Sequence, residues 1–187
     1  MNNPLDEERL QFYLRHRDDI REWASIEREV ILATRELLAA SQTELEERLV
    51  GIDPGATTSR RDGSRYERIV AHRAGWPQGV GVTLEWETGV DPFGSVLPKY
   101  GIFLLNDEPS FQPARVRIAA LVESTAGITA NGFGVSNGKV WPAVKSVPKS
   151  TDWWQDPAAW TGRIVDAMIE LWPLAAVQFD RGLIEAG

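Results

Sequence analysis

The chain has 187 residues, of which 43% are apolar and 25% are charged, and its formal net charge is −7. An acidic chain is a poor general coat for nucleic acid, which requires an excess of lysine and arginine to displace counterions. The sequence contains no cysteine, which excludes disulfides, thiolate metal sites and cysteine nucleophiles. The composition is that of a globular protein without a phosphate-loop or dinucleotide motif, and we expect no cofactor.

The first residues predict a cytoplasmic protein with a long N-terminal helix. The opening stretch, MNNPLDEERL, is acidic and lacks the apolar segment of a signal peptide. Residues 5–49 have helical periodicity, and we predict a helical arm over 1–50 and a sheet domain over 51–187, together forming one compact unit. An apolar stripe runs along this helix at Trp23, Ile26, Val30, Ala33, Leu37 and Ala40. Two interpretations are open: the stripe docks the helix on its own domain, or it joins two copies in a homodimer.

The next part of the chain is predicted to contain a loop and three strands. Ser41 and Glu44 fit a capping box, which predicts that the long helix breaks near residue 40. Residues 51–64 are rich in glycine, serine, threonine and proline and predict a loop. Strands are expected over 64–73, 80–87 and 99–105. Apolar and polar residues alternate in the second of these strands, so we expect one buried face and one face in water.

The C-terminal part is predicted to end in a long helix. Residues 112–124 fit both a helix and a strand, and Pro113, which suits a first helical turn, favours the helix. Asp156 and Pro157 have the residue types of a helix start, and Pro173 predicts a kink. The stripe of this helix consists of Trp160, Ile164, Met168, Leu171, Trp172, Ala175, Phe179 and Leu183. The whole pattern predicts an α+β fold: a long N-terminal helix, an antiparallel sheet of about four or five strands and a kinked C-terminal helix packed on the sheet.

The stretch GVSNG, residues 134–138, fits the pattern that presents the serine nucleophile of many hydrolases. We predict a β-hairpin instead, because Asn137 and Gly138 form a favoured two-residue turn. Both histidines, His16 and His72, precede Ser136, whereas hydrolases of this type have their histidine after the serine. We therefore do not expect Ser136 to be a nucleophile.

Three carboxylates near the second strand could form a metal site. Glu85, Glu87 and Asp91 have the oxygen ligands that Mg²⁺ prefers. Metal-dependent nucleases with acidic residues on such strands carry a lysine two positions after the second acid, and here that position is Gly89. We favour the interpretation that Glu85 and Glu87 belong to the water-exposed face of the strand, with no metal.

A basic cluster follows the arm. It includes Arg60, Arg61 and Arg65, with Arg68 and Arg73 nearby. Clustered arginines can contact an anion or the phosphates of a nucleic acid, or they can pair with acidic side chains of the same chain. We favour the second interpretation and leave the first open.

Tryptophan is concentrated in the C-terminal part of the chain. Trp160 and Trp172 lie on the apolar stripe of the last helix and are predicted core residues, and Trp141 is predicted to pack in the hairpin. Trp153 and Trp154 are adjacent, so in an extended segment their side chains diverge and both are hard to bury. Tryptophan is enriched at protein interfaces, and these two are our candidate partner-binding residues, a structural role being the alternative.

These observations favour a non-enzymatic cytoplasmic interaction module that binds another protein and no membrane. The acidic composition, the lack of a convergent catalytic set and the tryptophan pair motivate this hypothesis. One alternative is a divalent-metal-dependent enzyme, or an accessory domain that accompanies a nuclease in prokaryotic defence, using the carboxylates of the central strand. The other is a nucleic-acid contact through the arginine cluster.

Overall fold

The computed structural model describes residues 7–90, 97–106, 108–136, 140–148 and 155–184. Within these ranges its helices are α1 (Glu7–Arg15), α2 (Arg17–Ile52), α3 (Gln112–Glu123), α4 (Ala126–Ala130) and α5 (Pro157–Ile184), with a short 3-10 helix, η1 (Pro109–Phe111). Its strands are β1 (Ala56–Asp62), β2 (Tyr66–Arg73), β3 (Val80–Glu87), β4 (Lys99–Leu104), β5 (Gly134–Ser136) and β6 (Trp141–Ser146). The strands form one antiparallel sheet in the order β1-β2-β3-β4-β6-β5. The predicted α+β fold is confirmed, with one strand more than expected.

The additional strand, β1, lies where we predicted a loop over 51–64. It is an edge strand of polar sequence, and α2 supplies partners for its hydroxyl groups. Glu46 accepts hydrogen bonds from the hydroxyls of Thr57 (2.8 Å) and Thr58 (3.0 Å), and Gln42 Nε2 donates to the Thr58 oxygen at 3.1 Å. These hydrogen bonds hold the pKa of Glu46 below its ordinary value. The loop prediction was wrong because the partners that stabilise this strand come from another element.

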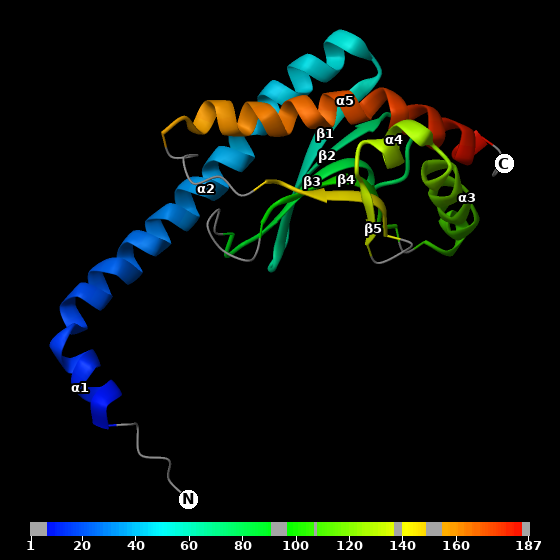
Figure 1. Cartoon of the computed structure of the whole chain (residues 1–187). Coiled ribbons are helices and arrows are strands. Elements are labelled where there is room, and N and C mark those ends of the chain that lie inside the picture. Colours follow the sequence, from blue (N-terminus) through cyan, green and yellow to red (C-terminus); the bar gives the residue numbers. More distant parts are fainter. Residues whose placement is uncertain (1–6, 91–96, 107, 137–139, 149–154, 185–187) are drawn as a thin grey trace, which may run out of the picture.

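The helices cover one face of the sheet (Figure 1). The long C-terminal helix α5 lies across the strands, and the second half of α2 packs beside α5 and against β1. The core between these layers includes Leu38, Leu84, Ile102, Trp172 and Phe179, each no more than 2% exposed. The first half of α2 and all of α1 project away from this body as an arm (Figure 1).

The central strand β3 is buried on both faces, which corrects the prediction of a water-exposed face. Its side facing away from the helices carries Thr83 and Glu85, which are 0% and 4% exposed. The neighbouring strand β2 places Val70 and Arg68 directly opposite these two positions, and the Arg68 guanidinium lies 4.9 Å from the centre of the Phe103 ring on β4. Large side chains of the flanking strands therefore cover the centre of this face.

Helix α2 departs from the sequence prediction in two ways. It runs without a break through residue 40, and the Ser41 hydroxyl donates within the helix to the Leu38 carbonyl oxygen at 2.7 Å, so the capping-box prediction was wrong. Its buried face consists of Thr34, Leu38, Ser41, Leu45 and Leu49. This face is offset by one residue, or about 100° of helix rotation, from the predicted stripe, whose members Ala33 and Ala40 are exposed.

The C-terminal predictions agree closely with the structure. Residues 112–123 form helix α3, with Pro113 in its first turn. Asp156 caps α5, since its Oδ1 accepts a hydrogen bond from the Ala159 backbone N–H at 2.9 Å. Every member of the predicted α5 stripe is buried or partly buried. The helix continues through Pro173, and the kink there stays a prediction. None of the helices that the structure describes combines the length and apolar character needed to cross a membrane.

Candidate functional site

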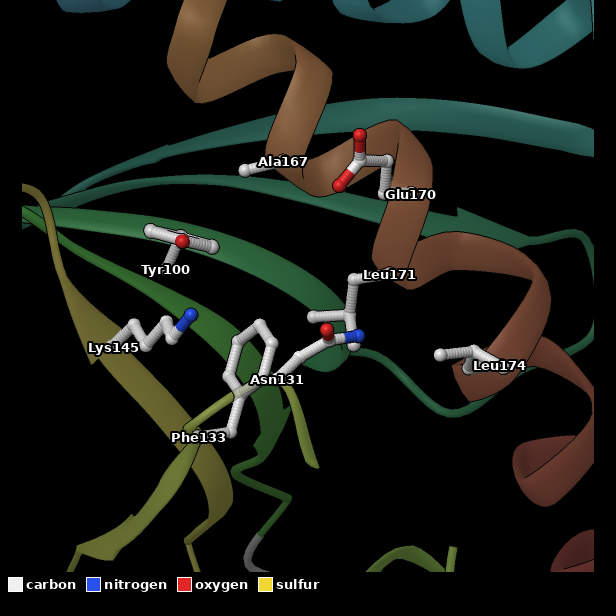
Figure 2. Close-up of a pocket in the computed structure, with 8 residues that line it drawn as sticks. All are labelled: Tyr100, Asn131, Phe133, Lys145, Ala167, Glu170, Leu171 and Leu174. Atoms are coloured by element: carbon white, nitrogen blue, oxygen red, sulfur yellow. The ribbon is translucent and has the colours of Figure 1, made fainter. Parts of the chain in front are cut away.

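A pocket opens between the sheet and α5, and it is lined by side chains from four separate parts of the chain (Figure 2). Tyr100 on β4 and Lys145 on β6 are directly opposite each other in the strand register, so both project from the same face of the sheet. Helix α5 contributes Glu170, together with the apolar Ala167, Leu171 and Leu174. The segment between α4 and β5 contributes Asn131 and Phe133. The cavity volume is about 90 Å³.

Phe133 organises the sheet side of this pocket. Its ring meets the Tyr100 ring edge-on, with the ring centres 5.7 Å apart and an interplanar angle of 84°. The Lys145 ammonium lies 4.9 Å from the centre of the same ring, within the range of a cation–π interaction. Lys145 forms no ion pair with any residue that the structure describes. Its positive charge therefore faces the pocket without an ion-pair partner among the described residues.

The remaining polar groups of the pocket are the Tyr100 phenol, the Glu170 carboxylate and the Asn131 amide. Burial raises the pKa of Tyr100, and the negative charge of Glu170 raises it further, so the phenol stays protonated at neutral pH. Asn131 Nδ2 donates to the Gly127 carbonyl oxygen at 2.7 Å, which leaves Oδ1 as the acceptor end of that amide. An ammonium, a phenol, a carboxylate and an amide thus surround one small cavity with an apolar wall.

The carboxylates singled out in the sequence are engaged in ion pairs. Glu85 lies between Arg68 Nε at 2.6 Å and Lys99 Nζ at 3.5 Å. Glu87 is 3.5 Å from Arg65 Nη2, and Asp91 lies outside the described residues. Among the described residues no three acidic or histidine side chains gather in a group that could hold a metal ion. The metal-site hypothesis stays untested.

The predicted arginine cluster does not form one patch. Arg60 reaches Glu67 beneath α2 at 3.0 Å, and Arg65 pairs with Glu87. Arg61 follows Arg60 on the same strand and so projects from the opposite face. There Arg61 lines an open pocket of about 500 Å³ with Gln78, Leu105, Asn106, Glu108 and Pro109, and its Nη2 has no hydrogen-bond partner among the described residues. An anion or nucleic-acid contact through these arginines stays a prediction.

Two other sequence candidates are only partly placed. Trp153 and Trp154 lie outside the described residues, so their partner-binding role is a prediction. The expected core residues Trp160 and Trp172 are buried, and so is Trp141 of the predicted hairpin, all at 5% exposure or less.

Ser136 ends β5, and the chain returns in β6 with Ser136 opposite Trp141. A strand, not the helix of a nucleophile elbow, therefore follows this serine, and the turn residues 137–139 lie outside the described residues.

The arm exposes a series of large apolar side chains that the body of the protein does not cover. They are Leu10, Phe12, Tyr13 and Leu14 on α1, and Trp23, Ile26 and Leu32 on α2, with exposed fractions from 44% to 63%. Between residues 8 and 33 no described side chain is buried. The interpretation in which the Trp23–Ala40 stripe docks the helix on its own domain is therefore wrong for its N-terminal half. The homodimer interpretation stays a prediction.

Sequence patterns singled out the arm but not the pocket. Tyr100, Lys145 and Glu170 belong to no recognisable motif, and each looks like an ordinary strand or helix residue. Only the pairing of β4 with β6 and the crossing of α5 bring them together. Comparison of the chain with protein-family models, with curated proteins and with solved structures found no match.

Proposed function

We propose that this chain is a non-enzymatic protein-interaction module and that its helical arm, residues 7–33, is the element that binds the partner. The observation that carries this proposal is the exposure of Trp23 and Ile26, at 63% and 49%, on a helix that projects from the body (Figure 1). Contiguous apolar surface of this kind is characteristic of interaction sites.

The arm also has a physical reason to require a partner. Helices in proteins gain most of their stability from packing of an apolar face rather than from intrinsic propensity. The arm has such a face, but before Thr34 none of its described side chains is fully buried, and Val30 is only partly buried against the core. A partner helix laid along the stripe would supply this packing and remove Trp23 from water.

The charges beside the stripe indicate the chemistry of the partner. Glu22, Glu29 and Glu36 are exposed and recur every seven residues along one border of the stripe. This spacing places them at equivalent positions of successive heptads, where charges decide the choice of partner. A partner helix whose apolar stripe is flanked by lysine or arginine would neutralise this row.

A second copy of the chain fits the arm less well. In an antiparallel pair the two glutamate rows would lie against each other, and in a parallel pair Glu22 would face Glu27 of the other copy. Like charges in these positions oppose pairing. We therefore propose a basic amphipathic helix of another protein as the partner, not a homodimer.

A pair of designed peptides tests this proposal. Both carry isoleucine and leucine at the heptad core positions, one with lysine and the other with glutamate at the flanking positions. We expect the full chain to bind the lysine peptide at least about tenfold more tightly, by fluorescence anisotropy, which corresponds to 1.4 kcal/mol. Binding should disappear in the double variant Trp23→Ala/Ile26→Asp and persist in Val116→Asp, which changes an equally exposed apolar residue on α3.

The outcomes separate the alternatives. Equal affinity for both peptides, or binding that survives in the double variant, would contradict the proposed partner. Light scattering of the chain alone provides the second measurement. A dimer that dissociates in the Ile26→Asp variant would show that the arm pairs with a second copy, which would overturn the basic partner while keeping the arm as the interacting element.

A further inference from the structure

We infer that the pocket in Figure 2 binds a small zwitterion of the α-amino acid type, with its carboxylate at Lys145 and Tyr100 and its ammonium at Glu170 and Asn131. This inference is independent of the arm, which lies on another part of the molecule (Figure 1).

The two ends of the pocket have opposite polarity. On the sheet side, the Lys145 ammonium and the Tyr100 phenol can both donate to an anionic oxygen (Figure 2). The phenol is kept protonated because burial raises the pKa of Tyr100, so it remains a donor at neutral pH. A carboxylate placed here would receive two hydrogen bonds, one of them strengthened by the lysine charge.

The other side of the pocket offers two acceptors, the Glu170 carboxylate and the Asn131 amide oxygen. The Glu170 carboxylate projects from α5 toward the space above Tyr100 (Figure 2), and it forms no ion pair with any described residue. Asn131 has Oδ1 as an acceptor, and one N–H of its Nδ2 donates to the Gly127 carbonyl oxygen. An ammonium group placed here would pair with the Glu170 carboxylate.

Lys145 and Glu170 do not neutralise each other directly, since they form no salt bridge, for which the N–O distance would be 4.0 Å or less. A molecule carrying both charges can bridge the gap. A simple anion would engage only Lys145 and leave the exposed Glu170 carboxylate to water, and a simple cation would engage only Glu170. The arrangement therefore favours a ligand with both charges.

The size and walls of the cavity limit the ligand further. A cavity volume of about 90 Å³ is small beside the roughly 300–1,000 Å³ of pockets that hold drug-sized ligands. The apolar side chains of Leu171, Leu174 and Phe133 line the remaining wall. They suit a short aliphatic side chain, such as that of alanine or valine.

Calorimetric titration of the full chain with L-alanine and L-valine tests the inference. N-acetyl-L-alanine and L-alaninamide are the matched compounds, since each keeps one of the two charges and lacks the other. We expect saturable binding of the free amino acids in about the millimolar range and at least about tenfold weaker binding of both blocked compounds.

Variants assign the two ends of the ligand. Lys145→Gln and Glu170→Gln should each weaken binding of the amino acids at least about tenfold. Glu170→Gln should weaken L-alaninamide binding but leave N-acetyl-L-alanine binding unchanged, and Lys145→Gln should do the reverse. Arg163→Gln, an exposed change on the outer side of α5, is the matched control and should leave every affinity unchanged.

Several results would overturn the inference. One is the absence of saturable binding by any of the twenty L-amino acids at about 10 mM, a concentration well above a millimolar dissociation constant. Another is equal binding of L-alanine and its blocked forms, which would mean that the two charges are not read. A third is unchanged affinity in both glutamine variants, provided that circular dichroism shows them folded.

Discussion

Arg73 connects three elements of the fold, and its replacement by methionine should destabilise the protein. The guanidinium at the end of β2 donates from Nε to Asp53 Oδ2 at 2.8 Å and from Nη1 to Asp180 on α5. Asp53 ends α2 and also accepts a hydrogen bond from Trp172 Nε1 at 3.1 Å. Methionine resembles the aliphatic stem of arginine in shape and apolar character. Arg73→Met therefore removes mainly the charged guanidinium and its two hydrogen bonds.

The exposure of the three groups sets the magnitude. A hydrogen bond to a charged group contributes about 1.5–3 kcal/mol, and leaving a buried carboxylate without its partner adds to the loss. Side-chain exposure is 14% for Asp53, 32% for Arg73 and 35% for Asp180, so water replaces part of what is lost, chiefly at Asp180. We therefore expect a loss of about 2–4 kcal/mol, which lowers the melting temperature of a chain of this size by roughly 5–15 °C.

Thermal and urea unfolding followed by circular dichroism measure this loss, with Arg48→Met as the matched control. Arg48 also joins α2 to α5, through Asp166 at 2.6 Å, but these side chains are 39% and 57% exposed. Exposed pairs contribute about 0–1 kcal/mol, so the control should melt within a few degrees of the parent chain. Equal melting temperatures for the two variants would refute the reasoning that burial makes the Arg73 network stabilising.

Two further predictions concern stability. Burial opposes ionisation of Asp53, but hydrogen bonds from Arg73, the Gly55 N–H and Trp172, with the Arg73 charge, outweigh it and lower the pKa of Asp53. The contribution of Asp53 to the free energy of unfolding is therefore present above its unfolded pKa of about 3.9 and is lost as pH falls through the lower folded value. Urea unfolding between about pH 5 and pH 2 should show that the stability of Asp53→Asn decreases less with falling pH than that of the parent chain. An identical pH profile for both chains would contradict this assignment. Gly182→Ala should lower the free energy of unfolding by about 1–3 kcal/mol, because the added Cβ would lie 2.4 Å from Cγ1 of the buried Ile118. Gly162 has open space around it, so Gly162→Ala should be neutral or stabilise α5 by up to about 1 kcal/mol. Similar melting temperatures for the two alanine variants would show that α3 and α5 are not in close contact at Gly182.

The sequence alone determined the elements whose signals are local. The Asp156 cap and the apolar stripe of α5 predict where that helix begins and which face it buries, because one continuous segment contains the whole pattern. The strand β3 was predicted with its bounds for the same reason. The second face of β3 was not, because its cover comes from Arg68 and Phe103 on other strands.

The tertiary structure decided which surfaces remain free and which residues meet. Helix α2 has apolar residues on more than one side, so its sequence could not say that Leu38 and Leu45 would face the body and that Trp23 would stay in water. The polar strand β1 forms because Glu46, on a different element, accepts its hydroxyl hydrogen bonds. The pocket exists because sheet pairing sets Tyr100 beside Lys145 and the crossing of α5 brings Glu170 over them. Such long-range placement leaves no local periodicity or spacing, and this is the physical reason why sequence reasoning recovered the elements but not the site.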